Sequence, residues 1–261
     1  MAGKPEQRAS LQGDAGATAG CVAGTGGELL ELLPRLEQEA RNGRLRVVLA
    51  SSSPRRRELL SRIVLAERVP FDVVVSNFAE DWDKSLFRGR AEEYVQSYAA
   101  EKARAVESAL LLALGLQDGL VLVIGCDTVV VQDGLILEKP RDAAEAEAMV
   151  GSYSARSHDV VSGLCLVLLE VRAGVHAART ETISVCSTRV HFPPLASSTV
   201  RAYVATGEPM DKAGGYGIQG LGGMLVRGIE GCYYNCVGLP VFALAEGMAK
   251  LLRPRLERPL P

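Results

Sequence analysis

The sequence feature that most restricts the fold is a strand, a serine-rich turn and a helix start within residues 46–60. Residues 47–50 are apolar and partly β-branched, which is typical of a buried strand. Ser53 is a suitable N-cap, and Pro54 fits the first helical position, where its missing N–H costs nothing. We therefore predict a strand, a tight turn and a helix whose free backbone N–H groups and partial positive charge point at the turn.

The turn also gathers side chains that bind anions. Residues 51–53 supply three hydroxyl groups, and residues 55–57 supply three guanidinium charges. Such an arrangement collects an anion, most often a phosphate. For this stretch alone, a capped surface helix with solvated arginines is an equally good interpretation.

The composition indicates a globular protein with one large domain or two lobes, since 48% of the 261 residues are hydrophobic and 23% are charged. A net charge of −2, from 29 basic and 31 acidic side chains, lacks the basic excess of a duplex-binding surface, so we expect no nucleic-acid partner. No apolar run has the length of a membrane span, and the first residues lack a signal pattern. We therefore expect a cytoplasmic protein with no membrane partner. The six cysteines fit reduced thiols rather than a disulfide framework or a zinc site.

We divide the chain into an N-terminal extension, residues 1–43, and one domain, residues 44–261. Residues 1–27 are rich in Gly, Ala and Thr without an apolar period, which predicts disorder. Residues 28–41 predict an amphipathic helix, although Pro34 weakens it. Its apolar face would contain Leu29, Leu30, Leu33 and Leu36.

The remaining segments alternate between strand and helix patterns. Strands are expected at residues 71–76, 120–131, 135–140, 158–169 and 180–192. Helices are expected at residues 91–114, 142–149, 195–206 and 241–252.

Asp133-Gly134 separates two of the expected strands and is the strongest short hairpin signal. A two-residue turn places residue 128 opposite residue 139, so Lys139 comes within about one residue of Asp127. Asp127 lies inside an apolar strand, where an unpaired carboxylate would cost several kcal/mol. A functional role for Asp127, with a cation beside it, is therefore preferred over a structural one.

Three further candidates are ambiguous by themselves. The acidic loop with Glu80, Asp81 and Asp83 could hold a hard cation such as Mg²⁺, but a solvated acidic turn explains the loop better. Lys102, on an expected helix, could be an ordinary surface charge. Residues 215–220 match G-x-G-x-x-G, but they follow a polar segment and precede an apolar run, so we reject a dinucleotide site. We expect these glycines to form turns or to let the backbone approach a ligand.

Five stretches of the chain occur in an order that is specific in combination. They are residues 49–56, residues 101–103, residues 125–128 with 138–140, residues 207–220 and residues 237–240. Together they closely resemble the Maf family of nucleoside triphosphate pyrophosphatases over residues 46–252. The resemblance implies an α/β fold similar to that of inosine triphosphatase-like proteins, in which a long twisted mixed sheet separates two lobes that flank a nucleotide cleft.

The resemblance also implies hydrolysis of a nucleoside triphosphate to the monophosphate and pyrophosphate, by a homodimer that uses Mg²⁺ or Mn²⁺. Arg56, Thr128 and Gln219 fill the positions that mark a branch similar to the dTTP and UTP pyrophosphatases. The implied biological use is the removal of modified pyrimidine nucleotides. Two alternatives stay open: a purine-type pyrophosphatase acting on ITP or 7-methyl-GTP, and a non-catalytic regulator of cell division.

The same resemblance implies residue roles by position. Asp127 matches the proposed general base, Glu80 the loop carboxylate, and Lys102 and Lys139 the two lysines. Glu80 and Asp127 would hold the metal, although Asp81 could exchange roles with Glu80. The substrate-binding positions are Ser51, Ser53, Arg56, Thr128, Asp211, Lys212 and Gln219.

These residue types suit the chemistry. Splitting a triphosphate requires neutralised charge, an aimed water molecule and an acceptor for its proton. Arg56, Lys102 and Lys139 supply positive charge, and Asp127 would accept the proton. Gln219 carries both a donor and an acceptor, as does the edge of uracil or thymine, which makes it the candidate for reading the base.

Overall fold

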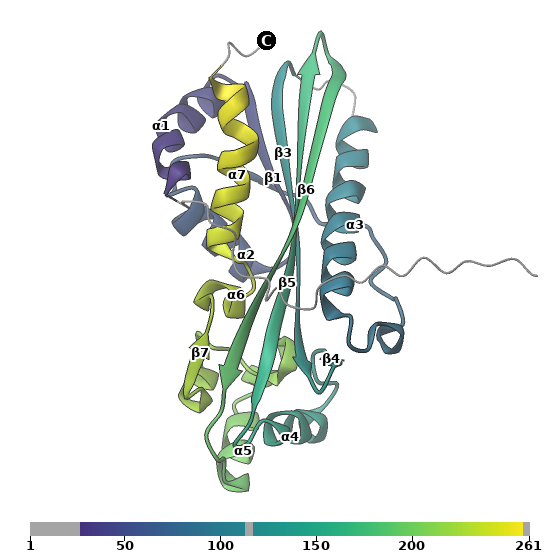
Figure 1. The fold of residues 1–261 in the computed structure, drawn as a ribbon, viewed down its shortest axis with the longest axis vertical. Helices are drawn as coiled ribbons and strands as arrows, with labels where there is room; N and C mark the ends of the chain where they lie inside the picture. Colours follow the sequence, from purple (N-terminus) through teal and green to yellow (C-terminus); the bar gives the residue numbers. More distant parts are fainter. Residues whose placement is uncertain (1–26, 113–116, 258–261) are drawn as a thin grey trace, which may run out of the picture.

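A computed structural model describes residues 27–112 and 117–257, which build one seven-stranded mixed sheet and the helices around it (Figure 1). The strands are β1 (Leu45–Ala50), β2 (Asp72–Val73), β3 (Gly119–Gln132), β4 (Leu135–Leu137), β5 (Ser157–Arg172), β6 (Val175–His191) and β7 (Gly228–Glu230). The α-helices are α1 (Glu28–Arg41), α2 (Pro54–Leu59), α3 (Ala91–Leu112), α4 (Ala143–Ser152), α5 (Ser197–Val204), α6 (Tyr233–Val237) and α7 (Val241–Leu256). Shorter turns are the π-helical η1 (Leu60–Val64) and the 3₁₀ turns η2 (Lys84–Phe87), η3 (Glu208–Asp211), η4 (Ala213–Gly215) and η5 (Leu221–Leu225).

The sheet has the strand order β2-β1-β3-β5-β6-β7, with β4 paired to β3 outside this path. Strands β1 to β3 run parallel, whereas β3, β5 and β6 are antiparallel and contain 14, 16 and 17 residues. These three strands twist along the length of the molecule and connect two lobes (Figure 1). This arrangement confirms the α/β fold expected from the sequence.

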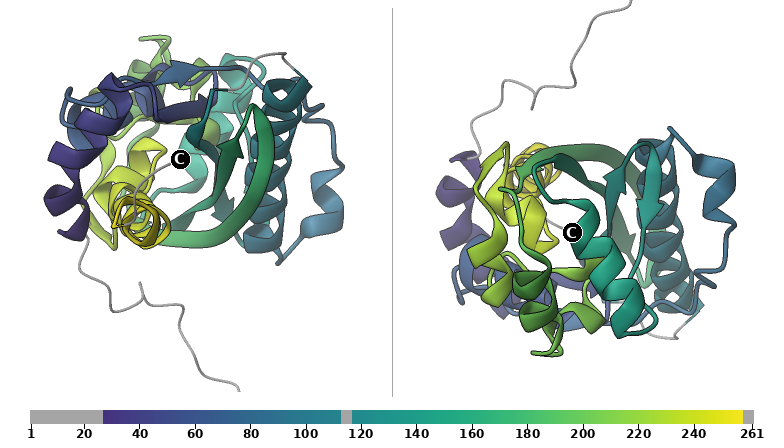
Figure 2. Two further views of the ribbon diagram at one scale, coloured as in Figure 1. Left: turned by 90° about the horizontal axis from the view of Figure 1, so that it is seen from above. Right: turned by 90° about the horizontal axis from the view of Figure 1, so that it is seen from below.

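Helices cover the sheet differently in the two lobes. In the upper lobe of Figure 1, α1 and α7 lie on one face and α3 lies on the other, as the end-on views also show (Figure 2). Leu36 and Leu252 are buried on the first face, and Ala103 and Val167 are buried on the second. In the lower lobe, α4 and α5 close a separate apolar cluster around Tyr153. Each lobe therefore has its own apolar core, and the long strands run through both.

The strand register places polar residues of β3 beside the serine-rich turn. Ala50, the last residue of β1, pairs in parallel with Gly125, but β3 continues to Gln132. Asp127 and Thr128 therefore lie just beyond the carboxyl end of β1. In open α/β sheets this is where ligands bind.

Two glycines let α3 lie directly on the sheet next to this point. A Cβ atom at Gly125 would lie 2.2 Å from the carbonyl oxygen of Ala99, and one at Gly163 would lie 2.1 Å from that of Val95. Gly163 is the antiparallel partner of Asp127. The close approach of the helix brings its lysine, Lys102, to the carboxylate of Asp127.

Helix α1 has the bounds predicted from the sequence and packs against α7. Leu29, Leu33 and Leu36 are buried, as expected, but Leu30 is 67% exposed. The prediction was wrong for Leu30. A helix turns by about 100° per residue, so Leu30 is rotated away from the face that Leu29 and Leu33 share, and Leu32 is buried on that face instead. The disorder predicted for residues 1–27 falls, apart from Gly27, outside the described residues, and the division at residue 43 stays a prediction.

The turn of the hairpin at Asp133-Gly134 was predicted correctly, but its second strand, expected at residues 135–140, is shorter than predicted. Asp133 and Gly134 have φ values of 52° and 75°, as a type I′ turn requires, and Val131 pairs with Ile136. Pairing of β4 with β3 ends at Leu137, two residues before Lys139.

The strand expected at residues 71–76 is also shorter in the structure, where only β2 belongs to the sheet. Val74 N–H makes one more hydrogen bond, to the Leu49 carbonyl at 3.0 Å, and the chain then leaves the sheet.

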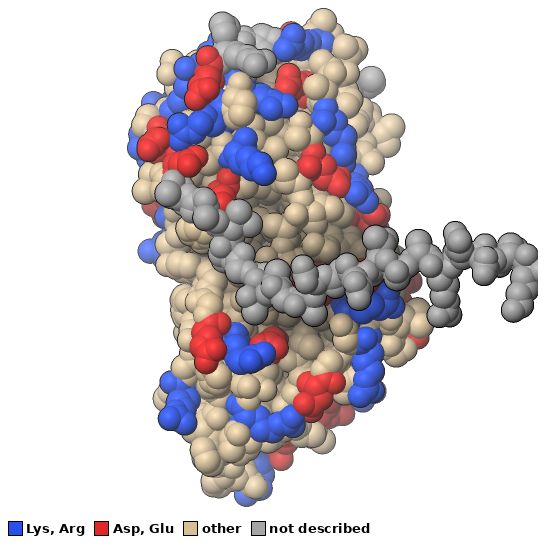
Figure 3. All heavy atoms as spheres, viewed as in Figure 1, with Lys and Arg blue, Asp and Glu red and all other residues tan. Residues whose placement is uncertain are grey.

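Charges are mixed on the surface. Basic and acidic side chains are interspersed over both lobes on the face in Figure 3, in agreement with the net charge of −2. None of the described helices is both long enough and apolar enough to cross a membrane.

Candidate active site

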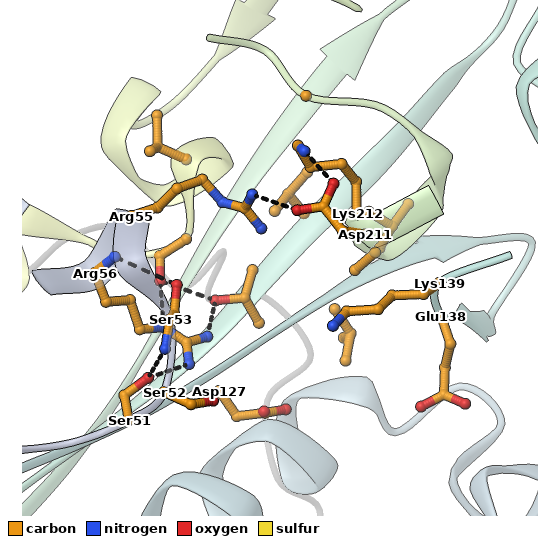
Figure 4. Close-up of a pocket in the computed structure, with 18 of the residues that line it drawn as sticks. Ser51, Ser52, Ser53, Arg55, Arg56, Asp127, Glu138, Lys139, Asp211 and Lys212 are labelled. Carbon is orange, nitrogen blue, oxygen red and sulfur yellow. Dashed lines mark hydrogen bonds and ion pairs between the residues drawn. The ribbon is translucent and has the colours of Figure 1, made fainter. Parts of the chain in front are cut away.

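One cavity of about 590 Å³ collects all the site residues predicted from the sequence. It lies beyond the end of β1 and is lined from both lobes (Figure 4). The predicted residues that line it are Ser51, Ser53, Arg56, Glu80, Lys102, Asp127, Thr128, Lys139, Asp211, Lys212 and Gln219. Five basic and four acidic side chains line the cavity, so it is strongly polar and nearly balanced in charge.

The serine-rich turn is held by its own hydroxyl groups. Ser53 Oγ accepts a hydrogen bond from the Arg56 N–H at 3.3 Å and caps α2, as predicted. Ser51 Oγ accepts from the Ser53 N–H at 3.2 Å. The Ser53 hydroxyl therefore orders the helix start, whose free N–H groups point toward the cavity.

Arg56 is fixed by contacts with three separate segments. Its Nε donates to the Gly238 carbonyl at 2.8 Å, its Nη2 to Thr128 Oγ1 at 3.1 Å and its Nη1 to Ser51 Oγ at 3.3 Å. Thr128 Oγ1 is also within 2.8 Å of Ser162 Oγ. The guanidinium is therefore preorganised at the cavity wall.

Two carboxylates share one buried ammonium group. Lys102 Nζ lies 2.8 Å from both Asp127 Oδ1 and Glu80 Oε2. The Lys102 and Asp127 side chains are 8% and 11% exposed, whereas Glu80 is 54% exposed. Hard oxygen ligands of this kind suit Mg²⁺, which is often bound by one or two carboxylates together with substrate phosphates. Within residues 27–112 and 117–257, no group of three or more His, Cys, Asp or Glu residues could form a complete metal site, so substrate oxygens would have to complete this one.

The acidic loop contributes one carboxylate to the cavity. Glu80 lines it, and Asp81 is not among the lining residues. Asp83 Oδ1 accepts from the Ser85 N–H at 2.9 Å and caps η2, and hydrogen bonds from Ser85 lower the pKa of Asp83. The geometry therefore favours Glu80 over Asp81 and gives Asp83 a structural role.

The two lobes contact each other across the cavity mouth. Arg55, from α2, places Nη1 3.3 Å from Asp211 Oδ2 in η3 (Figure 4). Lys212 Nζ also pairs with Asp211, and these hydrogen bonds and charges lower the pKa of Asp211, with the Lys212 contribution largest. Opposite them, Lys139 extends toward the middle of the cavity, while Glu138 points away and pairs with Lys84 at 2.5 Å.

Several other residues that line the cavity were not predicted as site residues, among them Arg55, Glu138 and Tyr94. Arg55 was noted only as part of the arginine run, and Glu138 and Tyr94 were not singled out. The Asp211 contact that gives Arg55 its position joins residues that are 156 positions apart, and no local pattern reports such a contact.

Comparisons with known proteins identify the family. The model of the Maf family, described as Maf-like protein, matches residues 46–251. A dTTP/UTP pyrophosphatase of Clostridium perfringens (strain 13 / Type A) is 42% identical over 205 residues, 78% of this chain and 96% of its own length. A dTTP/UTP pyrophosphatase of Anaeromyxobacter sp. (strain Fw109-5) is 44% identical over 217 residues, 83% of this chain and 92% of its own.

A crystal structure of a nucleoside-triphosphatase / dITP/XTP pyrophosphatase from Mycobacterium abscessus aligns over 57% of this chain and 75% of its own length. It aligns at 16% identity with a TM-score of 0.29, and this overlap carries no conclusion about the site. The family match covers most of the chain, and the curated relatives are matched over almost their whole length. The chain belongs to the Maf family.

Proposed function

We propose that this protein hydrolyses dTTP and UTP to the nucleoside monophosphate and pyrophosphate. The observation that carries the proposal is the buried Asp127, held by Lys102 in the same cavity as the Arg56 turn. The curated relatives named dTTP/UTP pyrophosphatase support it, since they match over 96% and 92% of their own lengths. Neither the purine-type alternative nor the division regulator receives comparable support.

The side chains of the cavity have different roles in the proposed reaction. Arg56, the α2 N-terminus and Lys139 bind the triphosphate and neutralise its charge. Asp127 orients the attacking water and accepts its proton, while the bond between the α phosphorus and the bridging oxygen breaks and pyrophosphate leaves. Lys102 holds the Asp127 carboxylate in place.

Glu80 and Asp127 are the residues that would hold a divalent cation, Mg²⁺ or Mn²⁺. When bound, such a cation neutralises phosphate charge and lowers the pKa of a coordinated water. The two oxygen donors that meet at Lys102 fit this requirement. Asp211 and Lys212 would bind the substrate at the lower lobe, and Gln219 would read the base.

A nucleotide panel tests the proposed function. Purified protein is supplied with dTTP, UTP, ITP and 7-methyl-GTP in Mg²⁺ or Mn²⁺, and pyrophosphate and orthophosphate are measured separately. We expect pyrophosphate release, fastest with dTTP and UTP. Release of orthophosphate, a preference for ITP or 7-methyl-GTP, or no hydrolysis at all would each contradict the proposal.

The expected homodimer and the cytoplasmic location rest on the resemblance and on the sequence. Light scattering on the purified protein tests the first, and imaging of the tagged protein in its cell tests the second.

A further inference from the structure

The loop of residues 217–222, which carries Gln219 on the cavity wall, is folded around the carboxylate of Glu208. Leu221 N–H donates to Oε2 at 2.8 Å, and Gly222 N–H donates to Oε1 at 3.0 Å. The Tyr203 hydroxyl donates a third hydrogen bond to Oε1 at 3.0 Å. One half-buried acid thus receives three donors, two of them from the backbone just after Gln219.

Tyr203 ties the other side of the loop to the same carboxylate. It is 6% exposed on α5, and its oxygen accepts a hydrogen bond from Gly217 N–H at 3.2 Å. The residues two before and two after Gln219 are therefore connected through Tyr203 and Glu208. This restricts the path of the backbone on both sides of the Gln219 side chain.

Gly220 and Gly222 lie directly against Glu208 and Tyr203, the two side chains that hold the loop. A Cβ at Gly220 would lie 2.4 Å from Glu208 Oε2, and a Cβ at Gly222 would lie 2.7 Å from the Tyr203 hydroxyl. Gly220 has a φ of −106°, which other residues also adopt, so the close approach and not the backbone angle calls for glycine here. Gly220, the last glycine of the G-x-G-x-x-G match, therefore allows the loop to approach an acid.

Glu208 is ionised within this network. Burial raises its pKa, but the hydrogen bonds from Gly222, Leu221 and Tyr203, together with the nearby Lys212 charge, outweigh burial and lower the pKa overall. Hydrogen bonds to a charged acceptor are stronger than neutral ones. A neutral side chain of the same shape would accept weaker hydrogen bonds from the loop backbone and would restrict the loop less.

We propose that Glu208 is a positioning residue for base recognition, which fixes the 217–222 loop so that Gln219 presents its amide to the pyrimidine. The inference rests on the proposed function and adds a residue that does not line the cavity. The edge of uracil or thymine offers a donor beside an acceptor, and a Gln amide matches both only when its position is fixed.

A double-mutant cycle tests the proposal. Glu208→Gln keeps the side-chain volume but replaces one acceptor oxygen with an N–H donor, so at least one backbone donor loses its partner. We expect KM for dTTP and UTP to rise about tenfold with a small change in kcat. Gln219→Ala should raise KM similarly, and Glu208→Gln should add little in the Gln219→Ala background. Inhibition by tripolyphosphate, which has no base, should stay unchanged.

Controls separate positioning from folding. Glu92→Gln changes an exposed acid of α3 outside the cavity and should leave KM unchanged. If Glu208→Gln does not fold, Tyr203→Phe replaces it in the cycle, because it removes the hydrogen bonds of Tyr203 with Glu208 and with Gly217 N–H, and we expect KM to rise again.

Full additivity of the two changes, or an equal loss of tripolyphosphate inhibition, would overturn the proposal. The same double-mutant cycle is repeated with the dissociation constant of dTTP, measured by calorimetry. This version of the cycle needs no turnover, so it gives a result even if the wild-type protein is not a pyrophosphatase. In that case non-additive binding supports Glu208 while the proposed function fails. A wild-type protein that binds no pyrimidine triphosphate overturns both.

Discussion

Lys102 and Asp127 form an ion pair of 2.8 Å on the floor of the cavity, with 8% and 11% of their side chains exposed. Such a pair contributes little net stability, because each charge loses its hydration on burial. Removing Lys102, however, would leave the buried Asp127 carboxylate uncompensated and cost about 3–5 kcal/mol, whereas Lys102 also pairs with Glu80. The pair is therefore better explained by a need for a fixed carboxylate at this point than by stability.

Asp127→Asn should remove nearly all turnover while nucleotide still binds. The amide is nearly isosteric but cannot accept a proton at neutral pH, so we expect kcat to fall by about 10²–10⁴-fold while dTTP still binds. Pyrophosphate release and calorimetry measure the two effects. Asp159→Asn is the matched control, because Asp159 pairs with Arg189 at 3.0 Å on the protein surface. Wild-type turnover in Asp127→Asn would remove Asp127 from the mechanism.

The sequence predicts those parts of the site that adjacent elements build. The strand, turn and helix start at residues 46–60 are local, and so is the hairpin that carries Asp127 on one arm and Lys139 near the other. Each has a turn or cap signal in the chain, and each was found where predicted. Asp127 was singled out because a charge in an apolar strand is costly, and the structure pairs it with Lys102, whereas the hairpin register had suggested Lys139.

Contacts between distant segments could not be predicted in this way. The Arg55–Asp211 pair and the contact of Arg56 with the Gly238 carbonyl depend on how the lobes close. The close packing of α3 depends on Gly163, which in the sequence is one glycine inside a strand pattern. Glu208 acts on a loop that begins nine residues later, and its acceptor role is visible only from the folded backbone.

Glu80→Gln should raise the divalent metal requirement. We propose Glu80 as a metal ligand, so its loss should increase the Mg²⁺ concentration for half-maximal activity at least about tenfold. Chelation should abolish activity in the wild-type protein, and added Mg²⁺ or Mn²⁺ should restore it. Asp81→Asn is the control, since Asp81 is adjacent but does not line the cavity. A larger effect at Asp81 than at Glu80 would reverse the assignment.

Gly163→Ala should destabilise the protein and weaken the site together. The added methyl group would meet the Val95 carbonyl oxygen at 2.1 Å, so α3 must move away from β5. We expect a loss of about 1–3 kcal/mol, with Tm falling by roughly 2–4 °C per kcal/mol, and a lower kcat because Lys102 moves with the helix. Gly151→Ala in α4 is the control: nothing lies within 4 Å of its Cβ, and alanine favours helix. Equal Tm values for the two variants would contradict this packing account.

The buried His158 should make stability depend on pH. Its Nε2 lies 2.8 Å from the Tyr216 hydroxyl, its Nδ1 has no hydrogen-bond partner among the described residues, and burial lowers its pKa from 6.5 to about 4. Between pH 6.5 and 4 the unfolded chain therefore binds a proton that the folded chain does not, so the free energy of unfolding falls as the pH falls. The shift corresponds to a loss of up to about 3 kcal/mol across this window.

Urea titrations at several pH values should therefore give a shallower dependence for His158→Gln than for the wild type. Glutamine can still bond to the Tyr216 hydroxyl but does not titrate. His176→Gln is the control, because His176 is exposed on β6 and its substitution should leave the pH dependence as it is. An unchanged slope in His158→Gln would show that other groups cause the acid sensitivity, whereas a flattened slope assigns it to this buried ring.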